Sequence, residues 1–184
     1  WLKTSCSFAP PTVMFETMIS FLVGVGYGSY FEKRFKPMLA VLVGEFSRRL
    51  GPGEPFQRGQ VRVHVQRAEN VPKLPNGAAP DVFVEIRMHK APSKEFEVTS
   101  VKMHSAAPQW DDEDAVDLNV DVHRDAMVTF ALHHHDPTKP SRLLADGAFN
   151  LALLRAGKTV VLPVPCRPRS SGAEAILHVQ FTTS

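Results

Sequence analysis

The chain has 184 residues, of which 43% are apolar and 22% are charged, and its formal net charge is +2. These values predict a packed core and exclude a wholly disordered chain. A near-neutral charge with scattered Lys and Arg argues against a nucleic-acid-binding protein, because such proteins gather basic residues on one face. Cys6 and Cys166 lie in different regions of the chain, so no disulfide framework is predicted.

The first 31 residues have the composition of a membrane segment. Residues 1–12 form an N-terminal extension that starts at Trp1 rather than Met, which favours removal of a targeting segment. Residues 13–31 carry one charge, Glu16, and as a helix they would measure about 28 Å, enough to cross a bilayer core. Gly24 and Gly28 would let a second helix approach closely, and Glu16 could pair with a neighbouring subunit. We predict a transmembrane helix, with burial in a partner protein or in a soluble core as the alternatives.

Residues 32–59 lead from this apolar segment to the rest of the chain. The stretch "EKRFK" at 32–36 is rich in positive charge, which predicts that the following residues face the cytosol, matrix or stroma. Residues 37–50 place their apolar side chains on one face and predict an amphipathic helix, either on the membrane surface or docked on a protein. Residues 51–59, "GPGEPFQRG", contain the glycines and prolines of a linker.

From residue 60 onward the period of the apolar residues changes from helical to alternating. Eight short runs alternate apolar and polar residues between turn-rich gaps, which predicts an all-β domain, an eight-stranded antiparallel β-sandwich at 60–184. The runs are 61–67, 81–88, 97–103, 115–120, 127–134, 145–151, 159–164 and 175–181.

The order of the motifs in this half resembles the C2 domain family, whose members are calcium- and phospholipid-binding β-sandwiches. "AENVPKLPNGAAPDVFVEI" is similar to the family's first turn, first loop and "S-D-P-Y-V" strand, and "APQW" at 107–110 is similar to its "N-P-x-W" motif, with Ala107 in place of Asn. "HHHDPTKPSRLLADGAFNL" resembles the third loop and the strand after it. A strand at the end of the chain resembles the family's circularly permuted topology, in which the last strand fills the place of the first.

The resemblance also implies where calcium would bind, because family members hold it with about five Asp side chains from two loops. Calcium requires six to eight oxygen ligands, so several carboxylates are needed. The five matching positions here are Pro75, Asp81, His134, Asp136 and Arg142. Two carboxylates remain, so we predict no metal site and no cofactor. Asp81 is expected to pair with Arg142 or with a backbone N–H instead.

Three other groups of residues suggest weaker hypotheses. His133, His134 and His135 suggest zinc, but alternate residues of a strand face opposite sides, so they would not converge on one ion. The acidic run 111–117 is interpreted as the solvated start of a strand. Basic residues around the second and third predicted strands could contact anionic lipid headgroups: Arg87, Lys90, Lys94 and Lys102.

The sequence contains no phosphate-binding glycine loop and no nucleophile motif, so we predict a protein that is not an enzyme. Our hypothesis is a calcium-independent, membrane-anchored, single-pass protein that acts as an accessory subunit of a larger membrane complex. An energy-transducing complex of the mitochondrial inner membrane or the thylakoid is one setting. The alternative is a phospholipid-binding tether or adaptor. The partners would be the membrane and other membrane subunits, with anionic phospholipid for the tether and no nucleic acid.

Overall fold

The computed structural model describes residues 50–90, 95–169 and 173–184. The predicted N-terminal extension, transmembrane helix and amphipathic helix (apart from Leu50) lie outside these residues, as do Glu16, Gly24 and Gly28. Within the described part of the chain, no helix is both long and apolar enough to cross a bilayer. The fold is therefore described for the compact unit that ends at Ser184.

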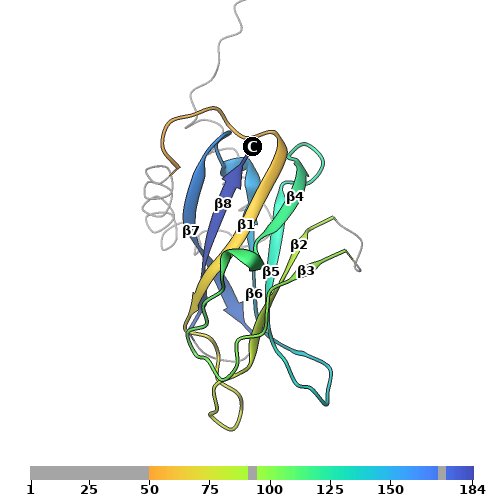
Figure 1. Cartoon of the computed structure of the whole chain (residues 1–184), viewed down its shortest axis with the longest axis vertical. Helices are drawn as coiled ribbons and strands as arrows, with labels where there is room; N and C mark the ends of the chain where they lie inside the picture. Colours follow the sequence, from red (N-terminus) through yellow and green to blue (C-terminus); the bar gives the residue numbers. More distant parts are fainter. Residues whose placement is uncertain (1–49, 91–94, 170–172) are drawn as a thin grey trace, which may run out of the picture. The chain divides into compact units, whose positions relative to one another are not determined.

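Eight antiparallel strands form this unit, as the alternating runs predicted (Figure 1). They are β1 (Arg58–Glu69), β2 (Val82–Met88), β3 (Glu97–Val98), β4 (Val116–Asp121), β5 (Met127–His134), β6 (Arg142–Asn150), β7 (Thr159–Pro168) and β8 (Ala175–Thr183). Two short 3-10 helices, η1 (Asp112–Asp114) and η2 (Leu151–Leu153), precede β4 and follow β6. The all-β class and the number of strands are confirmed.

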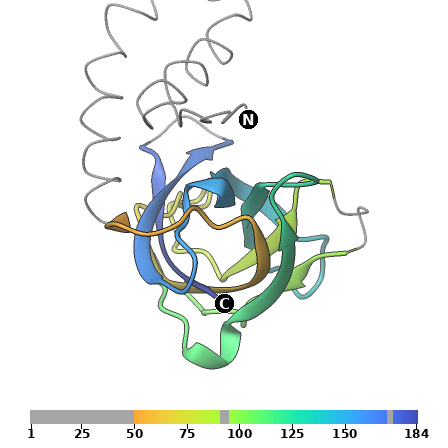
Figure 2. The same ribbon diagram turned by 90° about the horizontal axis from the view of Figure 1, so that it is seen from above.

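The strands pair in the order β3-β2-β5-β6-β7-β8-β1-β4, so one sheet curves around the core instead of remaining as two separate layers (Figure 2). Strands β3-β2-β5-β6 join strands β7-β8-β1-β4 where three residues of β6 pair with the end of β7. Gly147 lies at this join, and a Cβ there would come within 2.5 Å of the Pro165 carbonyl oxygen and 2.8 Å of the Cys166 sulfur. The close approach of β6 and β7 therefore requires a residue without a side chain.

The core is made by the inward-facing residues of these strands, among which three phenylalanines are in contact. The Phe181 ring stacks on Phe149, with centroids 4.6 Å apart, and meets Phe130 edge to face at 6.5 Å. β8 alternates between buried and half-buried residues along its whole length, as expected of a strand with one face on the core. Cys166 is buried beside it, and burial raises the pKa of its thiol to about 12.

A bulge in β1 changes which residues of the strand face the core. The pairing with β8 shifts between Val65 and Arg67, so Val65 and Ala68 both point into the core although they are three residues apart. The segment that carries the "APQW" motif covers the bulge from outside. Its Pro108 carbonyl accepts from the Ala68 N–H, and the Trp110 N–H donates to the Gln66 carbonyl.

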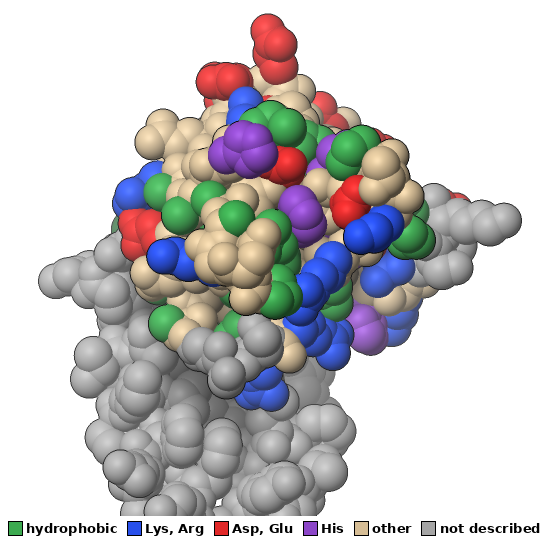
Figure 3. Space-filling model, turned by 90° about the horizontal axis from the view of Figure 1, so that it is seen from below, with side chains coloured by type: hydrophobic (Ala, Val, Ile, Leu, Met, Phe, Trp, Pro, Cys, Tyr) green, Lys and Arg blue, Asp and Glu red, His purple; other side chains and the backbone are tan. Residues whose placement is uncertain are grey.

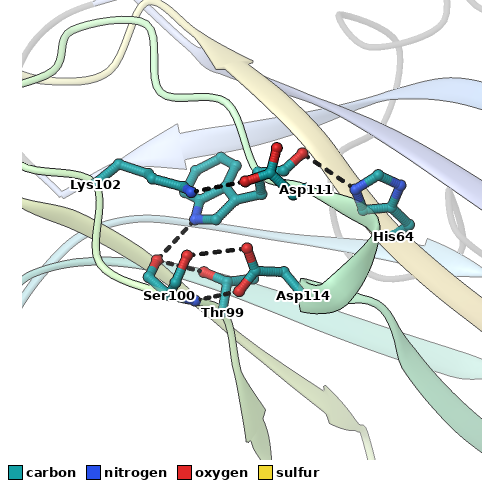
Figure 4. A network of polar contacts seen from close by, with 7 residues as sticks. His64, Thr99, Ser100, Lys102, Asp111 and Asp114 are labelled. Carbon is teal, nitrogen blue, oxygen red and sulfur yellow. Dashed lines mark hydrogen bonds and ion pairs between the residues drawn. The ribbon is translucent and has the colours of Figure 1, made fainter.

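Trp110 then fixes the chain that follows β3. Its indole N–H donates to the Ser100 carbonyl over 2.8 Å, and the Ser100 hydroxyl donates to Asp114 in η1 over 2.9 Å (Figure 4). The Thr99 hydroxyl accepts the Val84 N–H in place of a backbone carbonyl, so the regular ladder stops. The predicted strand 97–103 was therefore too long, because β3 ends at Val98. The acidic run is also more than a solvated start, because Asp114 holds this loop.

Residues 51–59, which were predicted as a linker, pack against the loop that follows η2. Phe56 is 2% exposed, and its N–H donates to the Leu154 carbonyl. The Ala156 N–H donates to the Glu54 carbonyl on the same side. The chain between Leu50 and β1 is therefore anchored to the loop that follows η2.

Candidate functional site

The loops that resemble calcium-binding loops lie together at one end of the sheet, at the bottom of Figure 1. One loop joins β1 to β2, and another joins β5 to β6. Figure 3 looks at this end and shows histidines among acidic, basic and hydrophobic side chains. Charges of both signs are interspersed there, so the face presents no uniform field to a ligand.

Asp81 is the best-defined residue of this end, because its carboxylate already accepts a hydrogen bond from the backbone. The residue is 8% exposed, and its Oδ1 accepts the His104 backbone N–H over 2.7 Å. The His104 ring also lies close, with Nδ1 3.1 Å from the same oxygen. His104 has a positive φ of 48°, a conformation that is uncommon without glycine and that directs its N–H at Asp81. The predicted pairing with a backbone N–H is thus found.

His134, the last residue of β5, binds the backbone of Asp81. The Asp81 N–H donates to His134 Nδ1 over 3.1 Å, which requires a neutral ring with its proton on Nε2. The next residue, His135, donates its N–H to the Asp81 carbonyl over 2.8 Å. Three segments of chain therefore meet at Asp81 through direct hydrogen bonds, with one imidazole standing where family members have a carboxylate.

The remaining three predicted positions do not join this junction. Pro75 is exposed in a turn of the β1–β2 loop. Asp136 accepts from the backbone and hydroxyl of Thr138 in a local turn, and these bonds lower the pKa of its carboxyl. Arg142 pairs with His134 in the β5–β6 ladder but, among the described residues, makes no ion pair. The alternative of an Asp81–Arg142 pair is therefore not found.

These positions set what the loop end can do chemically. In the part of the chain that the structure describes, no three His, Cys, Asp or Glu side chains are arranged to hold a metal ion. One oxygen of the Asp81 carboxylate, Oδ1, accepts the His104 N–H, which leaves the second oxygen as the acceptor still available there. The junction connects the loops through hydrogen bonds between the protein's own groups.

A second feature lies on the outer face of β2 and β5, where the histidine run separates as strand geometry predicts. His133 and His135 both contact Phe83: the His133 ring stacks on it at 5.2 Å, and the His135 ring meets it edge to face at 6.5 Å. His134 points to the opposite side, toward Asp81. These rings line an apolar groove of about 420 Å³, the aromatic groove, which also contains Glu85 and Phe96.

The basic residues proposed for lipid contact are spread along β2 instead of forming one patch. Lys102 lies opposite Val82 at the start of the strand and is 3.4 Å from Asp111. Arg87 is five residues further along, and Lys90 lies beyond the other end, where its amine donates to the Arg124 carbonyl. Lys94 lies outside the described residues. The structure therefore gives Arg87 different neighbours from those that the sequence suggested.

Arg87 shares a groove of about 450 Å³ with two residues that the sequence analysis missed, Arg167 and Arg169. This arginine groove lies beside the aromatic groove, and Glu85 lines both. Arg169 is held 3.1 Å from Asp146. The sequence pattern could have identified Arg167, because the alternation of apolar and polar residues continues past residue 164 and places Arg167 on the outer face of β7.

Comparison with known families agrees with this geometry. A model of the C2 domain family matches residues 59–161, more than half of the chain. The chain belongs to the C2 domain family. The resemblance to this family that the sequence suggested is thereby confirmed. No curated protein sequence matches the chain significantly.

Solved C2 structures share the fold at low sequence identity. The first of the C2 domains (domain A) of plant extended synaptotagmin 1 is 21% identical with a TM-score of 0.58, and the match covers 67% of this chain and 92% of that one. The paired C2 domains (A and B) of extended synaptotagmin 2 are 17% identical with a TM-score of 0.55, covering 72% and 43%. Human GIVD cytosolic phospholipase A2 is 17% identical with a TM-score of 0.56, covering 71% of this chain but 17% of the enzyme. The last two matches span less than half of those chains, and all three show the fold alone.

The Asp81 junction can be tested by removing its carboxylate. Asp81→Ala would remove the hydrogen bond between the His104 N–H and a charged carboxylate, so we expect the free energy of unfolding to fall by about 1–3 kcal/mol. Asp136→Ala removes only a local turn contact and is expected to cost less, under about 1 kcal/mol. Urea denaturation of both variants measures this, and equal losses would contradict a special role for Asp81.

Proposed function

We propose that this protein is a non-catalytic, calcium-independent C2 domain protein that acts through protein contacts as an accessory subunit of a larger membrane complex. The observation that carries the proposal is the small number of carboxylates at the five positions that resemble calcium ligands. Pro75, His134 and Arg142 stand at three of them, and the Asp81 carboxylate accepts the His104 N–H. A domain whose loops are held by its own groups can present a preformed surface without an ion.

The membrane setting of this proposal rests on the sequence of residues 1–50. The apolar stretch at 13–31 supports a single span, and the charges at 32–36 support a C-terminal domain on the positive-inside side. Gly24, Gly28 and Glu16 are better served by a neighbouring helix than by lipid, which supports a subunit of an assembly. The mitochondrial inner membrane and the thylakoid remain our proposed locations.

Two further points support this assignment. β8 lies between β7 and β1, the position expected for the circularly permuted form of the family, and we infer that topology. The phospholipase resembles this chain over 17% of its length, so the match brings no catalytic residues to the chain. The absence of a nucleophile motif in the sequence agrees with a protein that is not an enzyme.

A second candidate function is binding of anionic phospholipid, and the arginine groove favours it. Arg87, Arg167 and Arg169 line one concavity on the outer face of the sheet. Asp146 and Glu85 lie in the same groove and offset part of the charge. Each basic residue near an anionic surface contributes about 1 kcal/mol, so three partly paired arginines would give weak, salt-sensitive binding.

The assembly can be tested on the full chain in its native membrane. After mild detergent extraction and native electrophoresis, we expect the protein to migrate with other subunits at a size well above its own 20.4 kDa. Harsher detergent serves as the control, because it should release the single chain. Migration alone in mild detergent would overturn the subunit proposal.

Calcium independence can be tested by thermal unfolding of the full chain in detergent. A site with a dissociation constant of about 10 μM would add about 2.7 kcal/mol of stability at 1 mM calcium, because a ligand that binds the native state shifts unfolding. We expect no shift in the melting temperature between chelator and 1 mM calcium. A shift that Asp81→Asn abolishes would show that the loops bind calcium.

The lipid candidate is tested with soluble short-chain phosphatidylserine and isothermal titration calorimetry. Removal of one basic contact by Arg167→Gln should weaken binding about fivefold, which corresponds to about 1 kcal/mol. The matched control is Arg124→Gln, since Arg124 is exposed and lies outside the groove. Binding that is absent, or that does not depend on salt and on Arg167, would reject this candidate.

A further inference from the structure

The outer edge of β4 is open, because β4 pairs with β1 on one side and is the last strand of the sheet in the described part of the chain. The pairing runs over six residues without a shift in register, and β4 contains no proline. Six residues is a usual length for a paired strand. The sheet edge at β3 differs, because β3 has two residues and Trp110 and Asp114 bond to the chain just after it. Of these two outer strands, β4 presents the longer open edge.

The hydrogen-bond pattern determines which backbone groups face the open side of β4. The Val122 N–H donates to the Gln57 carbonyl just beyond the two strands, and bonded residues alternate along an antiparallel pair. The even-numbered residues of β4 therefore bond to β1, and Asp117 and Asn119 direct their N–H and C=O groups outward. No other strand reaches these groups within the described residues. They can bond to a strand from another chain, as in recognition by strand addition.

The side chains of β4 determine which kind of strand would fit beside it. Val116 and Leu118 point to the core side but are only half-buried, so an added strand would cover them with apolar residues. Asp117 and Asn119 are exposed on the outer side. A matching segment therefore alternates, with apolar residues on one face and polar residues on the other.

The charge beside this edge is negative, which selects basic residues for the polar face of the segment. Residues 111–121 contain six carboxylates and no lysine or arginine. Four cations lie within 4 Å of these carboxylates in the described part of the chain, which leaves two negative charges: Arg58, Arg62, Lys102 and Arg124. The contact between Arg62 and Asp117 is 3.7 Å long and half-exposed, so it neutralises Asp117 weakly. The same charge disfavours pairing with a second copy, because two acidic edges would repel each other.

We propose that the β4 edge binds an extended segment of a partner protein in which apolar residues alternate with lysine or arginine. The backbone of the segment pairs with Asp117 and Asn119, and its apolar side chains cover Val116 and Leu118. Its basic side chains lie on the outer face beside Asp117. This inference rests on the proposed function, because it names the surface through which the domain contacts another subunit. The contact requires neither a lipid nor an ion.

The edge is tested with the full chain in a sugar-based detergent and a short synthetic peptide that alternates valine with lysine. The peptide is blocked at both ends and labelled for fluorescence anisotropy. We expect it to bind, and the binding to weaken with salt. A peptide with glutamate in place of lysine, and one with methylated backbone nitrogens that cannot donate, should each bind at least about fivefold more weakly.

Variants of β4 locate the binding. Asn119→Pro removes an outward N–H and leaves the bonds to β1 in place, so we expect peptide binding to weaken at least about fivefold. Asn119→Thr keeps this N–H and favours a strand, so it should bind like the unmodified chain. Asp117→Lys should also weaken binding, and its matched control is Glu174→Lys, which reverses an exposed charge outside β4. Thermal unfolding checks that each variant is folded, and Asp117→Lys tests the edge without a proline.

Native electrophoresis separates this inference from the subunit proposal. Asn119→Pro and Asp117→Lys should release the chain from the complex with which the unmodified chain migrates, and Glu174→Lys should not. Variants that still migrate with the complex, or peptide binding that is absent or unaffected by them, would overturn the β4 edge as the contact surface. If the unmodified chain migrates alone, the subunit proposal fails and the peptide measurements still decide whether the edge binds a basic strand. Self-association that Asn119→Pro abolishes would overturn the assignment to a partner protein.

Discussion

The geometry of the loop end depends on one residue, Asp81, through both its backbone and its carboxylate. The residue lies directly before β2, where its N–H and carbonyl bond to His134 and His135 and its side chain accepts from His104. A buried carboxylate is costly unless its oxygens find donors, and here a backbone N–H supplies one. The same hydrogen bonds that stabilise this residue also fix three segments of the chain relative to one another. The loop end is therefore held together by the protein's own groups.

A second surface is formed by the outer face of the sheet. The outward residues of β2 alternate with its core residues, so Phe83, Glu85 and Arg87 lie in a row on one face. β5 places His133 beside Phe83, and the end of β7 brings Arg167 near Arg87. A negative group among rings and a positive group among arginines thus become neighbours although their strands are distant in sequence.

Other hydrogen bonds and one glycine stabilise the sheet where its strands are irregular or short. The β1 bulge exposes backbone groups that the segment around Trp110 satisfies, and the indole then holds Ser100. Asp114 completes the link from η1, so the short β3 strand is held at the edge by side chains more than by its own ladder. Gly147 lets β6 and β7 pair closely enough to make one curved sheet. The first two devices replace the regular ladder where it is interrupted, and Gly147 allows a ladder to form where the sheet bends.

The sequence by itself determined the all-β class and the eight strands, because the alternation of apolar and polar residues is a local property. It also limited the expected partners of the Asp81 carboxylate to Arg142 or a backbone N–H. Only the tertiary structure chose the His104 N–H over Arg142. His104 lies 23 positions from Asp81 in the sequence, and its left-handed backbone conformation directs its N–H at the Asp81 carboxylate. It alone placed Arg167 and Arg169 with Arg87, and it separated Lys90 and Lys102 from them, because the pairing of distant strands decides which outward side chains share a groove.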